Sequence, residues 1–131
     1  GETAFQREFQ RQPTRALETE AKNQLGAINR AQQAYRLENA QFTSSLDDLD
    51  VSVPQSTENY NYKIQKAQDY FAVATALAKT SKEIKNFAGI VYLDKDTQAI
   101  STEICALENS SNLSSKLAMD NVVQNDEVVC P

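Results

Sequence analysis

The spacing of hydrophobic residues along the chain changes near its middle. Between Ala16 and Asn39 they recur every three or four positions, which places them on one stripe of an α-helix. The stripe consists of Leu17, Ala21, Leu25, Ile28, Ala31 and Tyr35. Most charged and amide side chains of this segment, Asn29 and Arg30 among them, are expected off the stripe. The pattern predicts an amphipathic helix of about 24 residues, roughly 36 Å long.

Residues 40–59 follow as a connecting segment without a sustained period. Ser44 or Ser45 precedes the sequence LDDL, which is typical of a single helical turn, and Leu46 and Leu49 would pack that turn onto the core. Pro54 ends the turn region. A loop of this length usually has a function or packing of its own.

From Tyr60 to Leu107 the period becomes two, which predicts strands. The second strand alternates alanines with larger residues, so its alanine face could lie close against a helix. An alanine run is also compatible with a helix, but the flanking turns favour a strand. We expect an α+β fold, in which the long helix packs on a four-stranded antiparallel sheet. The predicted strands are 60–65, 69–79, 87–93 and 98–107, with a charged turn at 79–86.

The two ends of the chain lack these patterns. Phe5 and Phe9 are compatible with a helical turn or two, but Pro13 should break or kink a helix that runs through it. We therefore interpret residues 1–15 as a tag or non-native leader and residues 16–131 as the domain. Residues 108–131 show no clear period and are expected to form an irregular loop.

Composition narrows the function. The 131 residues fit one domain and carry a net charge of −5, with acidic and basic residues interspersed. No basic cluster is present to neutralise phosphates, so direct nucleic acid binding is not expected. No apolar run approaches the ~20 residues that cross a bilayer as a helix.

Candidate chemistry is sparse. The chain has no histidine, so its serines and cysteines lack the usual activating base. Carboxylates gather in two predicted turns and in the tail, and those in the turns are expected to be solvated. The second turn and the tail could in principle supply oxygen ligands for calcium, but neither has the spacing of an EF-hand loop. We assign no catalytic, cofactor-binding or metal-binding residue. The carboxylates and the tail amide considered are Asp47, Asp48, Asp50, Asp94, Asp96, Asp120, Asn121, Asp126 and Glu127.

Two cysteines, Cys105 and Cys130, lie in the last predicted strand and at the penultimate position. An even pair of this kind indicates a disulfide and an oxidising compartment, the alternative being two unrelated free thiols. Asn109 and Asn112 match the N-glycosylation acceptor pattern, which by itself has little predictive weight.

Residues 20–42, the SLDDL turn and the NYNYKI strand together resemble the region that follows the membrane helix in type IV pilins, particularly pilin-like proteins of cyanobacteria. The sequence NRAQQAY, residues 29–35, is the most specific part. A cysteine near the chain end, paired with one in the last strand, matches the disulfide-bounded C-terminal loop of that family. The resemblance implies the pilin fold.

The same resemblance implies a non-enzymatic filament subunit, without cofactors, that is processed and N-methylated. It would be held in the inner membrane by an apolar half-helix upstream, then displayed on the cell surface in a pilus. Its partners would be other pilin subunits and the pilus assembly machinery of the inner membrane. Adhesion, motility and DNA uptake remain open, as does major or minor status. The alternatives are a pseudopilin of a type II secretion system and a periplasmic binding or adhesin module.

Overall fold

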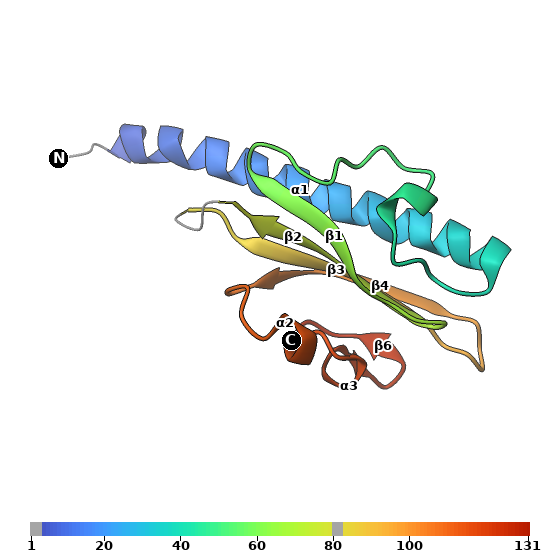
Figure 1. The fold of residues 1–131 in the computed structure, drawn as a ribbon. Helices are drawn as coiled ribbons and strands as arrows, with labels where there is room; N and C mark the ends of the chain where they lie inside the picture. The colour runs from blue at the N-terminus through green and yellow to red at the C-terminus, as the bar shows by residue number, and fades with distance from the viewer. Residues whose placement is uncertain (1–3, 80–82) are drawn as a thin grey trace.

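A long helix lies on one face of an antiparallel sheet, and the C-terminal segment lies on the other (Figure 1). This computed structural model describes residues 4–79 and 83–131. The sheet order β1-β2-β3-β4 is a simple meander, which confirms the predicted α+β architecture. The first elements are α1 (Ala4–Asn39), the 3₁₀ turn η1 (Leu46–Asp48), β1 (Tyr60–Ala67) and β2 (Phe71–Ala78). They are followed by β3 (Asn86–Leu93), β4 (Ile100–Leu107), α2 (Leu113–Lys116), α3 (Met119–Val122), β5 (Val123–Gln124) and β6 (Glu127–Val128).

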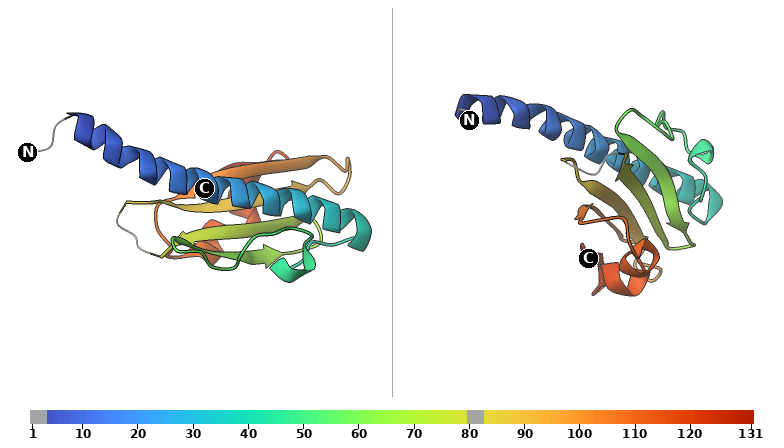
Figure 2. Two further views of the ribbon diagram at one scale, coloured as in Figure 1. Left: turned by 90° about the horizontal axis from the view of Figure 1, so that it is seen from above. Right: turned by 60° about the vertical axis from the view of Figure 1, so that its left-hand side comes forward.

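Helix α1 begins at Ala4, upstream of the start expected at Ala16, and runs through Pro13. The expectation that Pro13 would break the helix was therefore wrong. Proline removes one N–H from the helical ladder, but the Gln, Arg and Glu residues on either side favour helix and outweigh that single loss. The N-terminal part of α1 projects beyond the sheet (Figures 1 and 2). Residues 1–15, which were interpreted as a tag, lie partly outside the described residues. The same is true of the charged turn expected at 79–86.

The small side chains of β2 allow the helix to approach the sheet. Ala74 and Ala76 face α1 and are buried, whereas Phe71 and Val73 point to the opposite face. This arrangement confirms the predicted alanine face. The first core lies between α1 and the sheet and contains Ala21, Leu25, Ile28, Leu49, Tyr60, Tyr62, Ile64 and Phe87 in addition to the two alanines.

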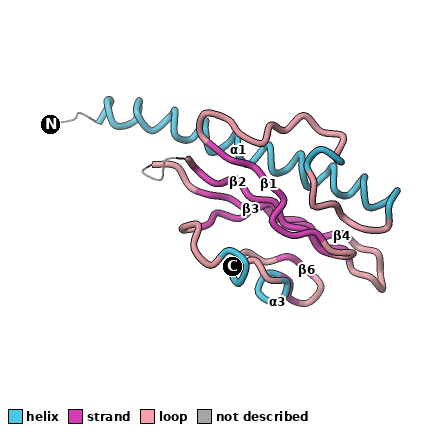
Figure 3. The backbone as a smooth tube through the Cα atoms, viewed as in Figure 1, coloured by secondary structure: helices cyan, strands magenta, loops and turns pink. Residues whose placement is uncertain are grey.

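The C-terminal segment is not the irregular loop that was expected. It contains the short helices α2 and α3 and the two-stranded ribbon β5-β6, drawn below the sheet in Figure 3. Leu117, Val122 and Val128 are buried against Phe71, Val73 and Ile90, forming a second core on the far face. Their spacing gives no period because Leu117 directly follows α2, Val122 ends α3 and Val128 lies in β6.

The ribbon closes through a turn that its sequence explains. Asn125 and Asp126 both adopt positive φ, 53° and 62°, between the paired residues Gln124 and Glu127. A two-residue hairpin with both φ values positive is a type I′ turn, which asparagine and aspartate tolerate best after glycine.

Candidate assembly surface

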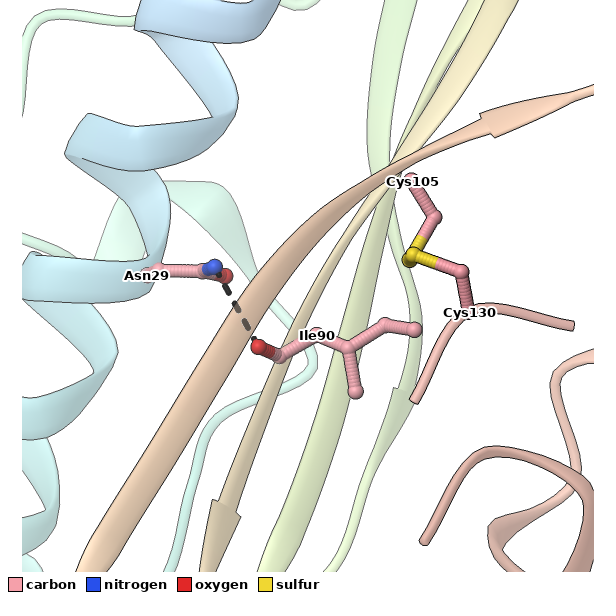
Figure 4. Close-up of a disulfide and its surroundings, with 4 residues drawn as sticks. All are labelled: Asn29, Ile90, Cys105 and Cys130. Atoms are coloured by element: carbon pink, nitrogen blue, oxygen red, sulfur yellow. Dashed lines mark hydrogen bonds between the residues drawn. A yellow bond between two sulfur atoms is a disulfide. The ribbon is translucent and has the colours of Figure 1, made fainter. Parts of the chain in front are cut away.

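Two buried amides fix α1 to the rest of the domain. The first, Asn29, was expected off the hydrophobic stripe but is 5% exposed, so that expectation was wrong. Its Nδ2 donates to the Ile90 carbonyl on β3, 3.3 Å away (Figure 4). Gly89, the residue before Ile90, has no side chain and so leaves room for Asn29. The hydrogen bond to Ile90 offsets the cost of burying the Asn29 amide.

The second amide, Gln32, attaches the connecting segment to the helix. Its Nε2 donates to the Thr43 carbonyl at 2.7 Å, and its Oε1 accepts from the Thr43 N–H at 3.0 Å. The Thr43 hydroxyl then donates to Asp48 at 2.7 Å and accepts from the Ser45 N–H. The Gln32 side chain thereby orders the start of the connecting segment and η1. The presence of η1 at Leu46–Asp48 confirms the helical turn that the LDDL sequence predicted.

Beyond η1 the connecting segment lies along the outer edge of β1. The Tyr62 N–H donates to the Gln55 carbonyl, and the Thr57 N–H donates to the Tyr60 carbonyl, both at 2.8 Å. A single bridge also joins Ser56 to Asn61. The loop therefore has packing of its own and covers this sheet edge, as its length suggested.

The connection before β3 is tied to the same part of the core. The Lys85 N–H donates to Glu18 of α1 at 2.7 Å, and the Tyr60 hydroxyl donates to the Lys85 carbonyl at 2.7 Å. Burial, with the nearby Glu18 carboxylate, raises the pKa of Tyr60 to about 12. Burial and Glu20 likewise raise the pKa of Tyr62 to about 12.

A disulfide joins Cys105 to Cys130 on the far face of the sheet. Their Cα atoms are 5.5 Å apart, and Cys105 is buried within the second core. Figure 4 shows the disulfide and Asn29 on opposite sides of the strands. Helix and tail are thus attached to opposite faces of neighbouring strands.

The carboxylates singled out in the sequence mostly serve local structure. Asp94 caps its own turn, accepting from the N–H groups of Asp96 at 2.8 Å and Thr97 at 3.2 Å. These two bonds lower the pKa of Asp94. The Tyr92 hydroxyl reaches Asp126 at 3.5 Å and so links the tail ribbon to β3. Burial and the Asp126 charge raise the pKa of Tyr92.

The remaining candidates are dispersed over the surface. Asp47 and Asp50 are exposed in the connecting segment, and Asp120, Asn121 and Glu127 are exposed in the tail. Across residues 4–79 and 83–131, no three His, Cys, Asp or Glu side chains gather in a group suited to a metal ion. Asn109 is exposed, and its Oδ1 accepts from the Lys116 ammonium.

The free side of α1 and the connecting segment leave an exposed surface on the helix side of the sheet. Leu37 on α1 is 89% exposed, which makes it the most exposed large hydrophobic side chain of the described chain. Arg36 places its guanidinium 5.2 Å from the Tyr70 ring and donates to the Asp69 carbonyl at 2.6 Å. No helix in the described part of the chain is long and apolar enough to cross a membrane.

Comparison with known proteins identifies the family. Residues 18–131 match the family model described as "Type IV pilin-like G and H, putative". The chain belongs to this type IV pilin-like family. Membership of it supports a structural role built on assembly with other pilin subunits, and a pilus- or surface-associated location. Curated proteins and solved structures give no significant match to this pilin-like protein.

The residues of the pilin-like domain that sequence reasoning missed are Gln32 and Thr43. Gln32 lies beside the hydrophobic stripe, one position after Ala31, and its neighbour Gln33 has the same chemistry. The available signal was position: Gln32 lies at a spacing of four from Ile28 and so faces the core side of the helix.

Proposed function

We propose that this pilin-like protein is a structural subunit of a type IV pilus filament and works by assembly rather than catalysis. The observation that carries the proposal is α1, a single 36-residue helix whose C-terminal half is packed on one face of the sheet while its N-terminal part projects past it (Figure 1). A projecting helix of this kind supplies an element by which subunits can pack against one another. The family match supports the same reading.

In this proposal the domain is displayed outward while the projecting end of α1 lies toward the filament axis. The subunit begins in the inner membrane with its domain in the periplasm, where an oxidising environment suits the Cys105–Cys130 disulfide. Leader cleavage and N-methylation would precede assembly. The pilus assembly machinery would then add the subunit to a filament that serves adhesion, motility or DNA uptake.

Leu37 offers a direct test of the exposed side of α1. A hydrophobic side chain that is 89% exposed in the isolated domain is a candidate for burial between neighbouring subunits. We expect Leu37→Asp in the full-length chain to leave the fold intact and reduce the amount of the protein in sheared filaments. Glu38→Gln, a change at the neighbouring exposed position, is the matched control and should assemble normally.

The measurement is quantitative mass spectrometry of sheared surface filaments, with the membrane fraction as reference. Complete absence of the wild-type protein from filaments, with filaments unchanged in its deletion strain, would contradict the proposal. Retention in the membrane combined with a loss of protein secretion would instead identify the pseudopilin role.

A further inference from the structure

The two edge strands of the sheet, β1 and β4, differ in how far the rest of the chain covers their outer backbone groups. The outer edge of β1 is covered by the connecting segment, carries the exposed Lys63, and has a register shift between Ile64 and Lys66. These are devices by which proteins prevent edge-to-edge pairing. Strand β4, at the opposite margin of the sheet (Figure 2), has a continuous register with β3 and contains no lysine or proline.

The backbone pattern identifies the groups that β4 presents outward. The Leu93 N–H donates to the Tyr70 carbonyl and therefore points away from β4, which makes Leu93–Ile100 a pair without direct hydrogen bonds. Such pairs alternate along an antiparallel ladder. The N–H and C=O groups of every second residue from Ile100, namely Ile100, Thr102, Ile104 and Ala106, consequently face outward.

Nothing in the described chain pairs with this edge. Within residues 4–79 and 83–131, β3 is the only strand that pairs with β4, and no loop forms a backbone hydrogen bond with Thr102, Ile104 or Ala106. Strand β4 is eight residues long and pairs with β3 without a register shift, which is enough to template one further strand.

A groove runs beside this edge on the helix side. It has a volume of about 300 Å³ and is lined by Gly26, Asn29, Arg30 and Gln33 of α1 and by Thr102, Glu103 and Ile104 of β4. Gly26 supplies a floor without a side chain, and the Arg30 Nη1 lies 3.4 Å from the position that a Cβ there would occupy. Arg30 is exposed. The one acidic residue in this lining, Glu103, pairs in register with Ile90, whose side chain lies in the second core, so the Glu103 side chain is on the far face of β4 and not on the side of Arg30.

We propose that the outer edge of β4 binds an extended peptide segment of a partner protein, which adds a fifth strand and places a carboxylate side chain in the groove beside Arg30. The strand edge supplies main-chain hydrogen bonds, and the groove supplies selection for an acidic side chain. The inference does not depend on the role in filaments.

A second copy of this chain fits the site less well. Residues of β4 that face the helix side are Ile100, Thr102, Ile104 and Ala106, and none of them carries a carboxylate for Arg30. The helix-facing residues of β1 are Tyr60, Tyr62 and Ile64, which are also uncharged and already buried. Neither edge strand of a second copy therefore supplies the acidic side chain, which favours a different partner protein.

The probe is the capped peptide KTVEVTK, whose central glutamate and two threonines share one face of an extended strand, with its KTVQVTK counterpart as the neutral match. In amide NMR titrations we expect the glutamate peptide to shift Thr102, Ile104 and Ala106, and to leave the amides of Tyr60, Tyr62 and Ile64 unmoved. Arg30→Gln should weaken the glutamate peptide about three- to tenfold, because one charge-assisted contact is lost, and change the affinity of the glutamine peptide less than twofold.

Thr102→Pro removes an outward N–H that bonds nothing within the sheet and should abolish binding of both peptides, whereas Thr102→Val should retain it. If Thr102→Pro fails to fold, the wild-type shift pattern and the Arg30→Gln comparison decide the matter alone. Equal loss of both peptides in Arg30→Gln, shifts outside β4, or concentration-dependent β4 shifts without peptide would each overturn the proposal.

Discussion

Asn29 and Gly89 meet where α1 crosses β3, and each requires the other. A Cβ added to Gly89 would lie 3.1 Å from the Asn29 Oδ1 and 3.1 Å from the Leu25 Cβ. The Leu25 Cβ is fixed by the helix backbone, so it cannot move aside without moving α1. The bond from Asn29 to the Ile90 carbonyl depends on this close approach.

Gly89→Ala should therefore destabilise the domain by about 1–3 kcal/mol, as over-packing of a core usually does. The matched control is Gly26→Ala on the same helix, where the added Cβ would meet only the mobile Arg30 guanidinium at 3.4 Å. Alanine gains about 1 kcal/mol over glycine within a helix, so this variant should be more stable than the wild type. Urea unfolding measures the change in the free energy of unfolding for each variant, and the two changes should have opposite signs. A Gly89→Ala variant as stable as the wild type would contradict the close packing of α1 on β3.

Gln32→Ala should detach the connecting segment. The substitution leaves the buried N–H and C=O of Thr43 without their partner, which should cost about 2–3 kcal/mol. Hydrogen exchange should accelerate from Thr43 through η1 while β3 stays protected. Gln33→Ala, one residue along, removes a side chain outside this network and should change the stability by less than about 0.5 kcal/mol. Equal effects of the two substitutions would refute the special role of Gln32.

The sequence allowed the fold to be predicted wherever burial follows a regular period. The stripe through Leu25 and Ile28 placed α1 on the sheet, and the alternation in β2 placed its alanine face against the helix. Gln32 was missed because its partner Thr43 lies in a loop, where no period signals contact. The second core was missed because Leu117 lies in the turn after α2, whereas Val122 and Val128 lie in two other short elements.

The path of α1 through Pro13 shows the limit of single-residue rules. A proline argues locally against a helix, but the backbone outcome depends on the whole run of neighbouring residues. Among the candidate carboxylates, the positions of Asp94 and Asp96 in a chain reversal were predicted correctly from turn preferences. The contact between Asp126 and Tyr92 was not predicted, because it depends on how the tail packs and the sequence carries no signal for that packing.

Ala40 ends α1 in a conformation that suits glycine. Its φ is 59°, and its N–H donates to the Arg36 carbonyl at 3.0 Å, as at a left-handed helix C-terminus. Ala40→Gly should stabilise the domain by about 1 kcal/mol, because the left-handed penalty of alanine is removed. Ala34→Gly, the same change at an exposed mid-helix position, should destabilise it by about 1 kcal/mol. Thermal unfolding of the pair tests whether the sign depends on backbone conformation alone.

The Cys105–Cys130 disulfide closes the tail over the second core across a sequence separation of 25 residues. The loop-entropy model assigns such a closure about 3.5 kcal/mol. The intact mass of native protein should rise by about two hydrogens on reduction, and titration should find no free thiol. Cys105→Ser should expose the tail to proteolysis, with cleavage between β4 and α2 or near the C-terminus. Two free thiols in native protein would rule the bond out, and unchanged cleavage would contradict its role in holding the tail.

Stability should fall at alkaline pH because Tyr60 and Tyr62 are held neutral in the folded domain. Their pKa values rise from 10.0 to about 12, chiefly through burial. A raised folded pKa contributes stability that is complete below the unfolded pKa and is lost as the pH rises through the folded pKa. The urea midpoint should therefore drop between pH 10 and about 12. Tyr62→Phe keeps the ring and should make this drop shallower relative to the wild type. A drop of unchanged steepness in Tyr62→Phe would show that other groups, such as the lysines, control alkaline unfolding.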